Sequence, residues 1–128
     1  KQTHVNVTSY NRLVLLTGEV PTEEVRLDVG SLARKVAGVR TVANELAVAP
    51  ETTLSSRPND TYITSRVKTR FIEARKFQVN HVKVVTENGV VYLMGLVKKQ
   101  EGDAAADIAA RTSGVKKVVQ VFEYLTDQ

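Results

Sequence analysis

The chain of 128 residues contains no cysteine and no tryptophan. The absence of cysteine excludes a disulfide framework, a thiolate zinc site and a cysteine nucleophile within this sequence. Long apolar runs are also absent: Val90–Val97 has eight residues, one of them glycine, whereas a membrane-spanning helix needs about 20. No signal peptide is visible, because Lys1–Thr3 does not combine a basic start with a following apolar run.

A large excess of charge of one sign is missing as well. The formal net charge is +4, the charged fraction 25% and the hydrophobic fraction 42%. These fractions are close to globular averages, so a wholly disordered chain is not expected. The small positive excess favours anionic partners, either lipid head groups or nucleic acid, but it is weaker than the dense basic stripe of a dedicated nucleic-acid binder.

The sequence is an internal repeat. At a shift of 77 positions His4–Val7 aligns with His81–Val84, and Val14–Val20 aligns with Val91–Val97. One residue is then lost, and at a shift of 76 Gly38–Val39 aligns with Gly114–Val115. Two copies of a small unit, each with a shared part of about 45 residues, explain the chain better than one domain does.

Each copy has the pattern of two strands, a helix and a strand. In the first copy Val5 and Val7 alternate with polar residues, Tyr10–Arg12 is a turn, and Leu13–Thr17 is a second strand that ends at Gly18. In the second copy Asn88–Gly89 occupies the turn and predicts a type I′ hairpin. The closing strands are expected at Thr41–Val48 and Lys117–Tyr124.

The helix of each copy follows its second strand. In the first copy Pro21–Glu24 provides a cap and early carboxylates, and Gly38 is the expected stop. Helical spacing predicts one apolar face in each copy, formed by Val25, Val29, Leu32 and Val36 in the first and by Ala105, Ile108, Ala109 and Thr112 in the second.

A further helix, Asp60–Arg75, is predicted before the second copy, with Asn59 or Asp60 as its cap. The first copy has no such segment, so the chain is truncated there or the other copy covers the exposed sheet face. Pro, Ser and Thr residues mark a linker at 50–59. The expected organisation is a first unit at 1–49, this linker, and a second unit at 60–128.

The sequence offers little for catalysis. His4 and His81 occupy equivalent positions at a strand start, and Glu23, Glu24 and Glu87 fit a helix start and a hairpin. No phosphate-binding loop and no triad or paired-carboxylate pattern rises above chance. We therefore expect neither an enzyme nor a metal or cofactor site.

The predicted helix 60–75 is the strongest candidate for binding. Ile63, Val67 and Phe71 form its core stripe, while Tyr62 and Ile72 lie off that stripe among cations. Apolar tips among cations suit the surface of an anionic bilayer. Three alternatives remain open: an ordinary amphipathic helix with a solvated face, burial between the two units, and nucleic-acid binding, for which stacking aromatics are sparse.

The repeat resembles the BON domain (bacterial OsmY and nodulation). The segments that carry the resemblance are Val82–Gly89, Val91–Gly95, Ala105–Ala109 and Ser113–Val118, together with Val7–Asn11, Val14–Gly18 and Gly38–Val42 of the first copy. Two tandem copies resemble the dual BON-domain outer-membrane lipoproteins of the DolP (YraP) group. The resemblance implies two α-β-β-α-β sandwiches, each with a three-stranded mixed sheet, the first lacking its leading helix in this chain.

The resemblance also implies a site and a location. In this family anionic phospholipid binding is attributed to the first helix of the second BON domain, which matches residues 60–68 here, and Tyr62 stands where related sequences can have tryptophan. The implied lipid-binding residues are Tyr62, Arg66, Val67, Lys68, Arg70 and Ile72. The implied location is the periplasm, with an N-terminal lipid, absent from this chain, as the anchor to the inner leaflet of the outer membrane.

The sequence therefore predicts a non-enzymatic lipoprotein that binds an anionic phospholipid surface and supports outer-membrane integrity; the family is also linked to cell-division sites. The alternative is a protein-interaction module that docks on outer-membrane assembly proteins through a β-edge or an interdomain groove. No nucleic-acid partner is expected.

Overall fold

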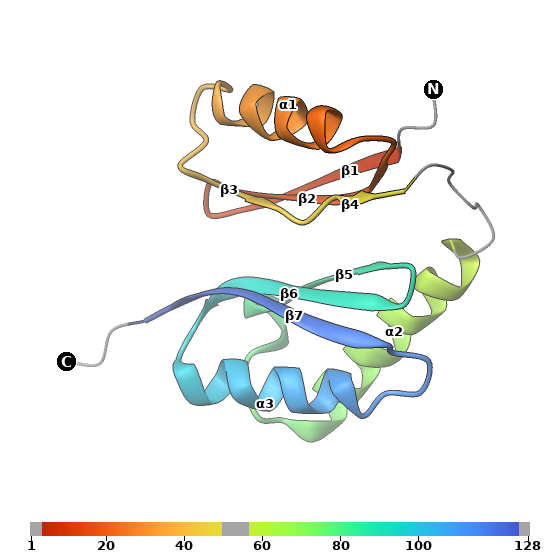
Figure 1. Cartoon of the computed structure of the whole chain (residues 1–128). Helices are drawn as coiled ribbons and strands as arrows, with labels where there is room; N and C mark the ends of the chain where they lie inside the picture. The colour runs from red at the N-terminus through yellow and green to blue at the C-terminus, as the bar shows by residue number, and fades with distance from the viewer. Residues whose placement is uncertain (1–3, 50–56, 126–128) are drawn as a thin grey trace. The chain divides into compact units, whose positions relative to one another are not determined.

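The structure, a computed structural model, describes residues 4–49 and 57–125 (Figure 1). The chain divides into two compact units, Lys1–Leu54 and Ser55–Gln128. Each unit combines helical and mixed-sheet structure, so the predicted α+β class is confirmed. Across the described ranges, no helix has the length and apolar character needed to cross a bilayer.

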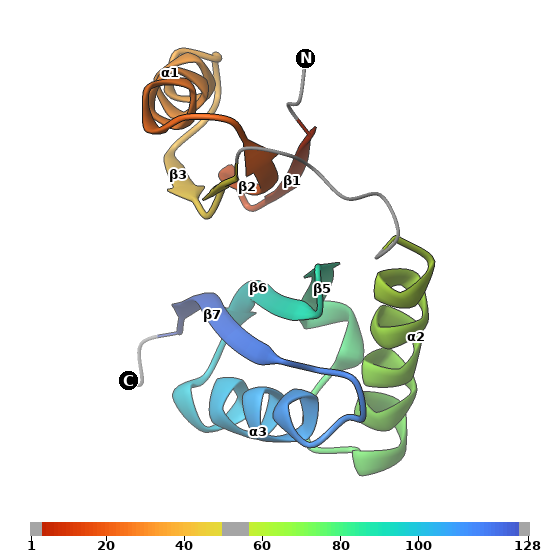
Figure 2. The same cartoon turned by 45° about the vertical axis from the view of Figure 1, so that its right-hand side comes forward.

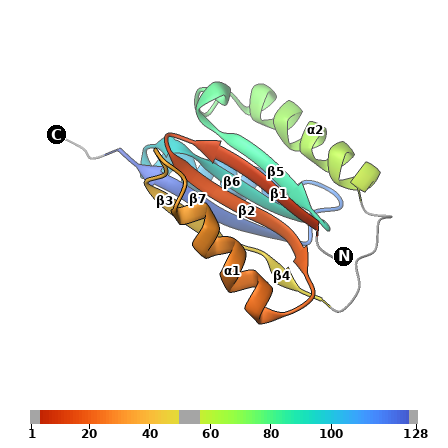
Figure 3. The ribbon, with the colours of Figure 1, turned by 90° about the horizontal axis from the view of Figure 1, so that it is seen from above.

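The first unit has a mixed sheet with one helix on it. Strand β1 (His4–Tyr10) pairs antiparallel with β2 (Leu13–Val20), and β2 pairs in parallel with both β3 (Thr41–Asn44) and β4 (Ala47–Val48). Helix α1 (Glu23–Arg34) packs against β2, β3 and β4 (Figure 3). Strand β1 is the first element that the described residues of this unit contain.

The closing strand of the first unit is interrupted, and the expected single strand at Thr41–Val48 is wrong. The side chain of Arg26 on α1 donates hydrogen bonds to the carbonyl oxygens of Asn44 (3.0 Å) and Leu46 (3.1 Å). The Asn44 side chain in turn accepts from the Leu46 N–H at 3.2 Å. These bonds hold a kink between β3 and β4, which makes the sheet four-stranded rather than three-stranded.

Helix α1 buries a narrower apolar face than the spacing of its apolar residues predicted. It begins after Thr22, whose hydroxyl accepts from the Val25 N–H at 3.1 Å. Val25, Val29 and Ala33 pack against the core formed by β2 and Leu46. Leu32 and Val36 are 64% and 59% exposed, so their predicted place on this face is wrong. The face follows a spacing of four residues, and the helix ends before Val36.

The second unit has two helices on one face of a three-stranded sheet, as Figure 2 shows. Strand β5 pairs antiparallel with β6, and β6 pairs in parallel with β7. Helix α2 lies against β5 and α3 against β6 and β7. The elements in order are α2 (Arg57–Ala74), the 3₁₀ helix η1 (Val79–His81), β5 (Lys83–Glu87), β6 (Val90–Val97), α3 (Lys99–Ala110) and β7 (Lys117–Tyr124).

The core of the second unit lies between its helices and its sheet. Ile63, Val67 and Phe71 of α2 are fully buried and pack against β5, β6 and α3, which confirms the predicted stripe. Ala105 and Ala109 of α3 are also fully buried, as predicted. The predicted strand at Lys117–Tyr124 is confirmed as β7. Helix α2 starts at Arg57, inside the segment expected to be the linker.

The repeated glycines Gly18 and Gly95 lie inside the second strand of each unit, so the prediction that the strand of the first unit ends at Gly18 is wrong. Both have positive φ, +120° and +147°. A Cβ at Gly18 would collide with the carbonyl oxygen of His4, and a Cβ at Gly95 with that of His81. The duplicated glycine therefore permits a close approach between neighbouring segments of backbone.

Candidate functional site

Helix α2 is held in place from its N-terminal end. The carboxylate of Asp60 accepts hydrogen bonds from the backbone N–H groups of Asn88 (2.8 Å) and Gly89 (2.9 Å). These two residues form the tip of the β5–β6 hairpin and both have positive φ, which confirms the predicted type I′ geometry. Asp60 lies within α2 and is 7% exposed, so its predicted role as the helix cap is wrong.

Two more polar contacts join α2 to the rest of the second unit. The hydroxyl groups of Thr64 and Thr86 lie 2.7 Å apart and join α2 to β5. The guanidinium of Arg70 donates to the carbonyl oxygen of Arg111, just beyond the C-terminal end of α3, at 3.4 Å. Together with the core stripe, these contacts hold α2 against β5 and α3 of the second unit.

The other side of α2 is exposed and carries two large apolar tips. Tyr62 is 57% exposed and Ile72 is 59% exposed. Their separation of ten residues corresponds to about 15 Å along the helix axis and about 80° around it. Ser65 and Thr69 are exposed between them. Both tips can therefore meet a flat surface that runs parallel to the helix.

Cationic side chains flank the two tips. Arg66 and Lys68 are exposed and Arg70 is half-buried. The Arg66 guanidinium carbon lies 5.9 Å from the centre of the Tyr62 ring, and a nitrogen of the same group donates to the Tyr62 hydroxyl at 3.4 Å. From the spacing, Arg66 and Arg70 lie on one flank of the apolar tips and Lys68 lies on the other flank.

A shallow depression of about 290 Å³ lies along this side of the helix, and its lining is polar and charged. The residues that form it are Tyr62, Ser65, Arg66, Thr69, Arg70 and Glu73. Two guanidinium groups and three hydroxyl groups supply hydrogen-bond donors that suit phosphate oxygens. Glu73 is the one carboxylate among these lining residues.

The structure corrects one of the six predicted lipid-binding residues. Val67 is fully buried in the core of the second unit, so it cannot insert into a bilayer while α2 is folded. It belongs to the stripe with Ile63 and Phe71, on the side opposite Tyr62. The roles predicted for Tyr62, Arg66, Lys68, Arg70 and Ile72 stay predictions, and the geometry leaves four of them exposed and Arg70 half-buried.

The sequence interpretation missed Ser65, Thr69 and Glu73. Ser65 and Thr69 follow Tyr62 by three and seven residues, which is the spacing of one helix side, so a helical projection of the sequence contains the signal. For metal binding, residues 4–49 and 57–125 contain no cluster of three or more His, Asp or Glu side chains that could hold an ion.

Sequence comparison gives the family. The family model described as the BON domain matches twice, at residues 1–50 and 59–126. The chain belongs to the BON domain family. The two BON matches correspond to the two copies of the internal repeat.

Several characterised proteins are similar to this BON chain. It is 44% identical over 121 residues to the outer membrane lipoprotein DolP of Haemophilus influenzae, covering 94% of this chain and 63% of that protein. This similarity confirms the predicted resemblance to the DolP group. The 21 kDa hemolysin of Actinobacillus pleuropneumoniae is 33% identical over 98% of this chain and 64% of its own length.

The osmotically-inducible protein Y of Escherichia coli (strain K12) is 34% identical, over 92% of this chain and 60% of that protein. The chain thus spans about three-fifths of the length of these three relatives.

Proposed function

We propose that this chain is a non-enzymatic membrane-contacting part of a periplasmic, outer-membrane-associated lipoprotein. In this proposal α2 of the second BON domain binds an anionic phospholipid surface, and the contact supports outer-membrane integrity. The name of the DolP relative supports the envelope location. The single observation that carries the proposal is the exposed pair Tyr62 and Ile72, flanked by Arg66 and Lys68.

The anchoring of α2 supports a rigid contact surface. Asp60, Thr64 and the core stripe hold the helix from behind, so Tyr62 and Ile72 keep their relative positions without a cost of ordering the backbone on binding. The two side chains enter the boundary between head groups and acyl chains, while the cationic groups remain at the level of the phosphates. Each such cation near an anionic surface contributes about 1 kcal/mol.

Vesicle co-sedimentation tests the proposal. Vesicles that contain anionic lipid are compared with purely zwitterionic vesicles, with the wild type beside Ile72→Glu. We expect the wild type to bind the anionic vesicles selectively, and Ile72→Glu to bind them at least about tenfold more weakly, because a carboxylate replaces an inserted apolar group. Equal binding by the two proteins would exclude Ile72 as a membrane contact.

Two controls separate this effect from charge and from unfolding. Lys35→Gln removes one exposed positive charge in the first unit, which does not contain α2, and is expected to change vesicle binding by less than about twofold. Circular dichroism of Ile72→Glu should match that of the wild type, because Ile72 is 59% exposed and makes no contribution to the buried stripe.

A protein-docking role is the second candidate, and exposed apolar side chains in the first unit favour it. Val7 is 65% exposed, whereas its repeat equivalent Val84 is 7% exposed in the core of the second unit. Leu32 and Val36 add further exposed apolar surface to the first unit. Substitution of Val7 and Leu32 by Ser would weaken capture of an envelope partner but leave vesicle binding unchanged.

A further inference from the structure

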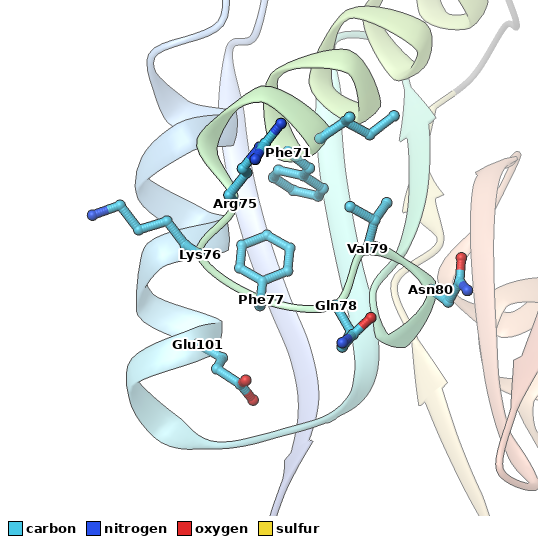
Figure 4. Close-up of a pocket in the computed structure, with 9 residues that line it drawn as sticks. Phe71, Arg75, Lys76, Phe77, Gln78, Val79, Asn80 and Glu101 are labelled. Atoms are coloured by element: carbon cyan, nitrogen blue, oxygen red, sulfur yellow. The ribbon is translucent and has the colours of Figure 1, made fainter.

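The second unit has a pocket of about 600 Å³ at the C-terminal end of α2. Its apolar floor contains Phe71 and Phe77, whose ring centres lie 5.0 Å apart in an edge-to-face arrangement. Figure 4 shows Arg75 and Glu101 on opposite sides of Phe77, and the Lys76 side chain pointing away from Arg75 and from the pocket. These charged groups do not converge on one position, whereas the edge of the sheet of this unit carries charges in a regular order.

Strand β7 forms that edge of the sheet. Its eight residues pair without a break with β6, from Lys117 opposite Val90 to Tyr124 opposite Val97. Among the described strands β6 is its only neighbour, and Figure 2 shows β7 at the margin of the sheet. Alternate residues of β7 therefore turn their N–H and C=O groups away from β6. Such an edge is a template for a further strand.

The first unit protects the equivalent edge of its own sheet. Its closing strand is divided into β3 and β4, of four and two residues, by the kink that Arg26 holds. Short and kinked edge strands resist pairing with another chain. One closing strand is thus interrupted and the other is continuous, which favours a binding role for β7.

The sequence of β7 is complementary to itself in one antiparallel register, in which a two-fold axis perpendicular to the sheet passes through Gln120. Every position then meets a side chain of matching chemistry. The pairs are Lys117 with Glu123, Val118 with Phe122, Val119 with Val121 and Gln120 with Gln120. Val118 and Phe122 both pack toward the core beneath the helices, so this pair lies on one face of the sheet. Opposite-charge and apolar pairs across neighbouring strands stabilise a sheet.

Other registers lose this match. With the axis at Val121, Glu123 meets Val119. With the axis at Val119, Lys117 meets Val121. A parallel pair in register would set Lys117 against Lys117, and like charges directly opposite each other weaken pairing. A lysine on an edge strand discourages unselective pairing, so Lys117 also selects the register in which Glu123 faces it.

We propose that β7 pairs with β7 of a second copy of this chain, antiparallel and with Gln120 on the two-fold axis. The two three-stranded sheets then form one continuous sheet, with α2 and α3 of both copies on the same face. Lys117 and Gln120 are exposed and Glu123 is half-buried. The inference goes beyond the proposed function, because neither Tyr62 nor Ile72 takes part in this pairing.

The absence of cysteine from the chain allows the register to be tested by disulfide formation. Under mild oxidation Gln120→Cys should give a cross-linked dimer, because directly opposite β carbons lie within about 5.5 Å. Lys117→Cys alone should not, since the two cysteines are about 20 Å apart along the strands. An equal mixture of Lys117→Cys and Glu123→Cys should cross-link as a heterodimer. Non-reducing gel electrophoresis and mass spectrometry identify the products.

Charge reversal tests the same register without a disulfide. Glu123→Lys places lysines opposite each other at two positions of the dimer and should raise its dissociation constant about tenfold in sedimentation equilibrium. The double variant Lys117→Glu, Glu123→Lys restores the opposite charges and should restore the wild-type constant. Glu24→Lys is the matched control, because it makes the same change of charge at an exposed residue of the first unit.

Each result supports or overturns the homodimer. A wild type that stays monomeric at millimolar concentration would overturn it and leave an extended segment of a different protein as the occupant of the edge. Cross-linking of Lys117→Cys alone as complete as that of Gln120→Cys would overturn the antiparallel register. Dimerisation unchanged by Glu123→Lys would place the contact on another surface. If Glu123→Lys fails to fold by circular dichroism, the double variant and the cysteine variants decide.

Discussion

Asp60 and Gly89 are joined by a hydrogen bond of 2.9 Å from the Gly89 N–H to the Asp60 carboxylate, in a buried environment. The second carboxylate oxygen accepts from the Asn88 N–H, so one side chain of α2 binds both amides at the hairpin tip. This pairing sets the position of α2 along β5 and β6. It therefore determines where the exposed side of the helix presents Tyr62 and Ile72.

Removal of the Asp60 carboxylate is expected to destabilise the second unit. Asp60→Ala leaves two backbone amides without their acceptor and should lower the free energy of unfolding by about 3 kcal/mol, whereas Asp60→Asn keeps one acceptor oxygen and should cost about half as much. Urea unfolding followed by circular dichroism measures the loss, and amide hydrogen exchange at Asn88 and Gly89 locates it. Asn59→Ala, an exposed neighbour, should cost less than about 0.5 kcal/mol.

Gly95→Ala and Gly38→Ala form a matched pair, because both glycines have positive φ. A Cβ at Gly95 collides with the carbonyl oxygen of His81. In residues 4–49 and 57–125, by contrast, no heavy atom outside the neighbouring residues lies within 4 Å of a Cβ at Gly38. We expect a loss of about 1–2 kcal/mol for Gly38→Ala, from backbone strain alone, and of about 3 kcal/mol or more for Gly95→Ala. Equal losses in thermal unfolding would contradict the close approach at Gly95.

Thr17→Val is expected to stabilise the first unit. The Thr17 hydroxyl is fully buried and has no hydrogen-bond partner among the described residues. Replacement by an apolar group of the same shape should raise the free energy of unfolding by about 1 kcal/mol. Thr112→Val is the control, because the Thr112 hydroxyl is also buried but donates to the Ile108 carbonyl oxygen at 2.9 Å. Thr112→Val should not raise the free energy of unfolding. A similar rise for both variants would show that the unpaired hydroxyl of Thr17 is not the cause.

Tyr62→Trp is expected to strengthen vesicle binding by about two- to fivefold, because tryptophan offers more apolar area at the interface. Tyr124→Trp is the matched control, since Tyr124 is an exposed tyrosine on β7 rather than on α2. Co-sedimentation with anionic vesicles measures both. A gain by the control alone would place the contact on a different surface from the one proposed.

Salt is expected to weaken vesicle binding. The Debye length falls from about 30 Å at 0.01 M to about 8 Å at 0.15 M ionic strength, which screens Arg66 and Lys68 from the lipid phosphates. Binding that falls with salt for the wild type, and less steeply for the Arg66→Gln, Lys68→Gln double variant, would support the charge contribution. Binding independent of salt would instead favour an apolar docking surface.

Much of the fold can be predicted because the sequence states it twice. The repeat gives the order of strands and helix in both units, and the spacing of Ile63, Val67 and Phe71 identifies the buried side of α2. The same spacing shows that Tyr62 and Ile72 lie off that stripe, so most of the candidate site follows from helix geometry. The sequence pattern allowed Val67 to lie either in the core or in the membrane contact, and the structure shows it fully buried in the core.

The remaining features depend on contacts between distant residues. Nothing in the local sequence indicates that Asp60 reaches a hairpin tip 28 positions away, since an acidic residue early in a helix normally suggests a dipole or capping role. The pocket beside Arg75 depends on a left-handed turn at an arginine, a residue with no special preference for that conformation. The exposed Leu32 likewise depends on which side of α1 meets the sheet.

The bonds from Arg26 to the kink between β3 and β4 show how far the duplicated units have diverged. At the position equivalent to Arg26 the second unit has Gly102, and an added Cβ there would lie 3.0 Å from the ring of Phe122, which corresponds to Leu46. In the first unit an arginine on the helix is thus paired with a kinked strand, and in the second unit a glycine on the helix is paired with an aromatic ring on the strand. If α1 and α3 were exchanged, Arg26 would face Phe122 and Gly102 would face the kink between β3 and β4. The helix of one copy therefore no longer fits the sheet of the other.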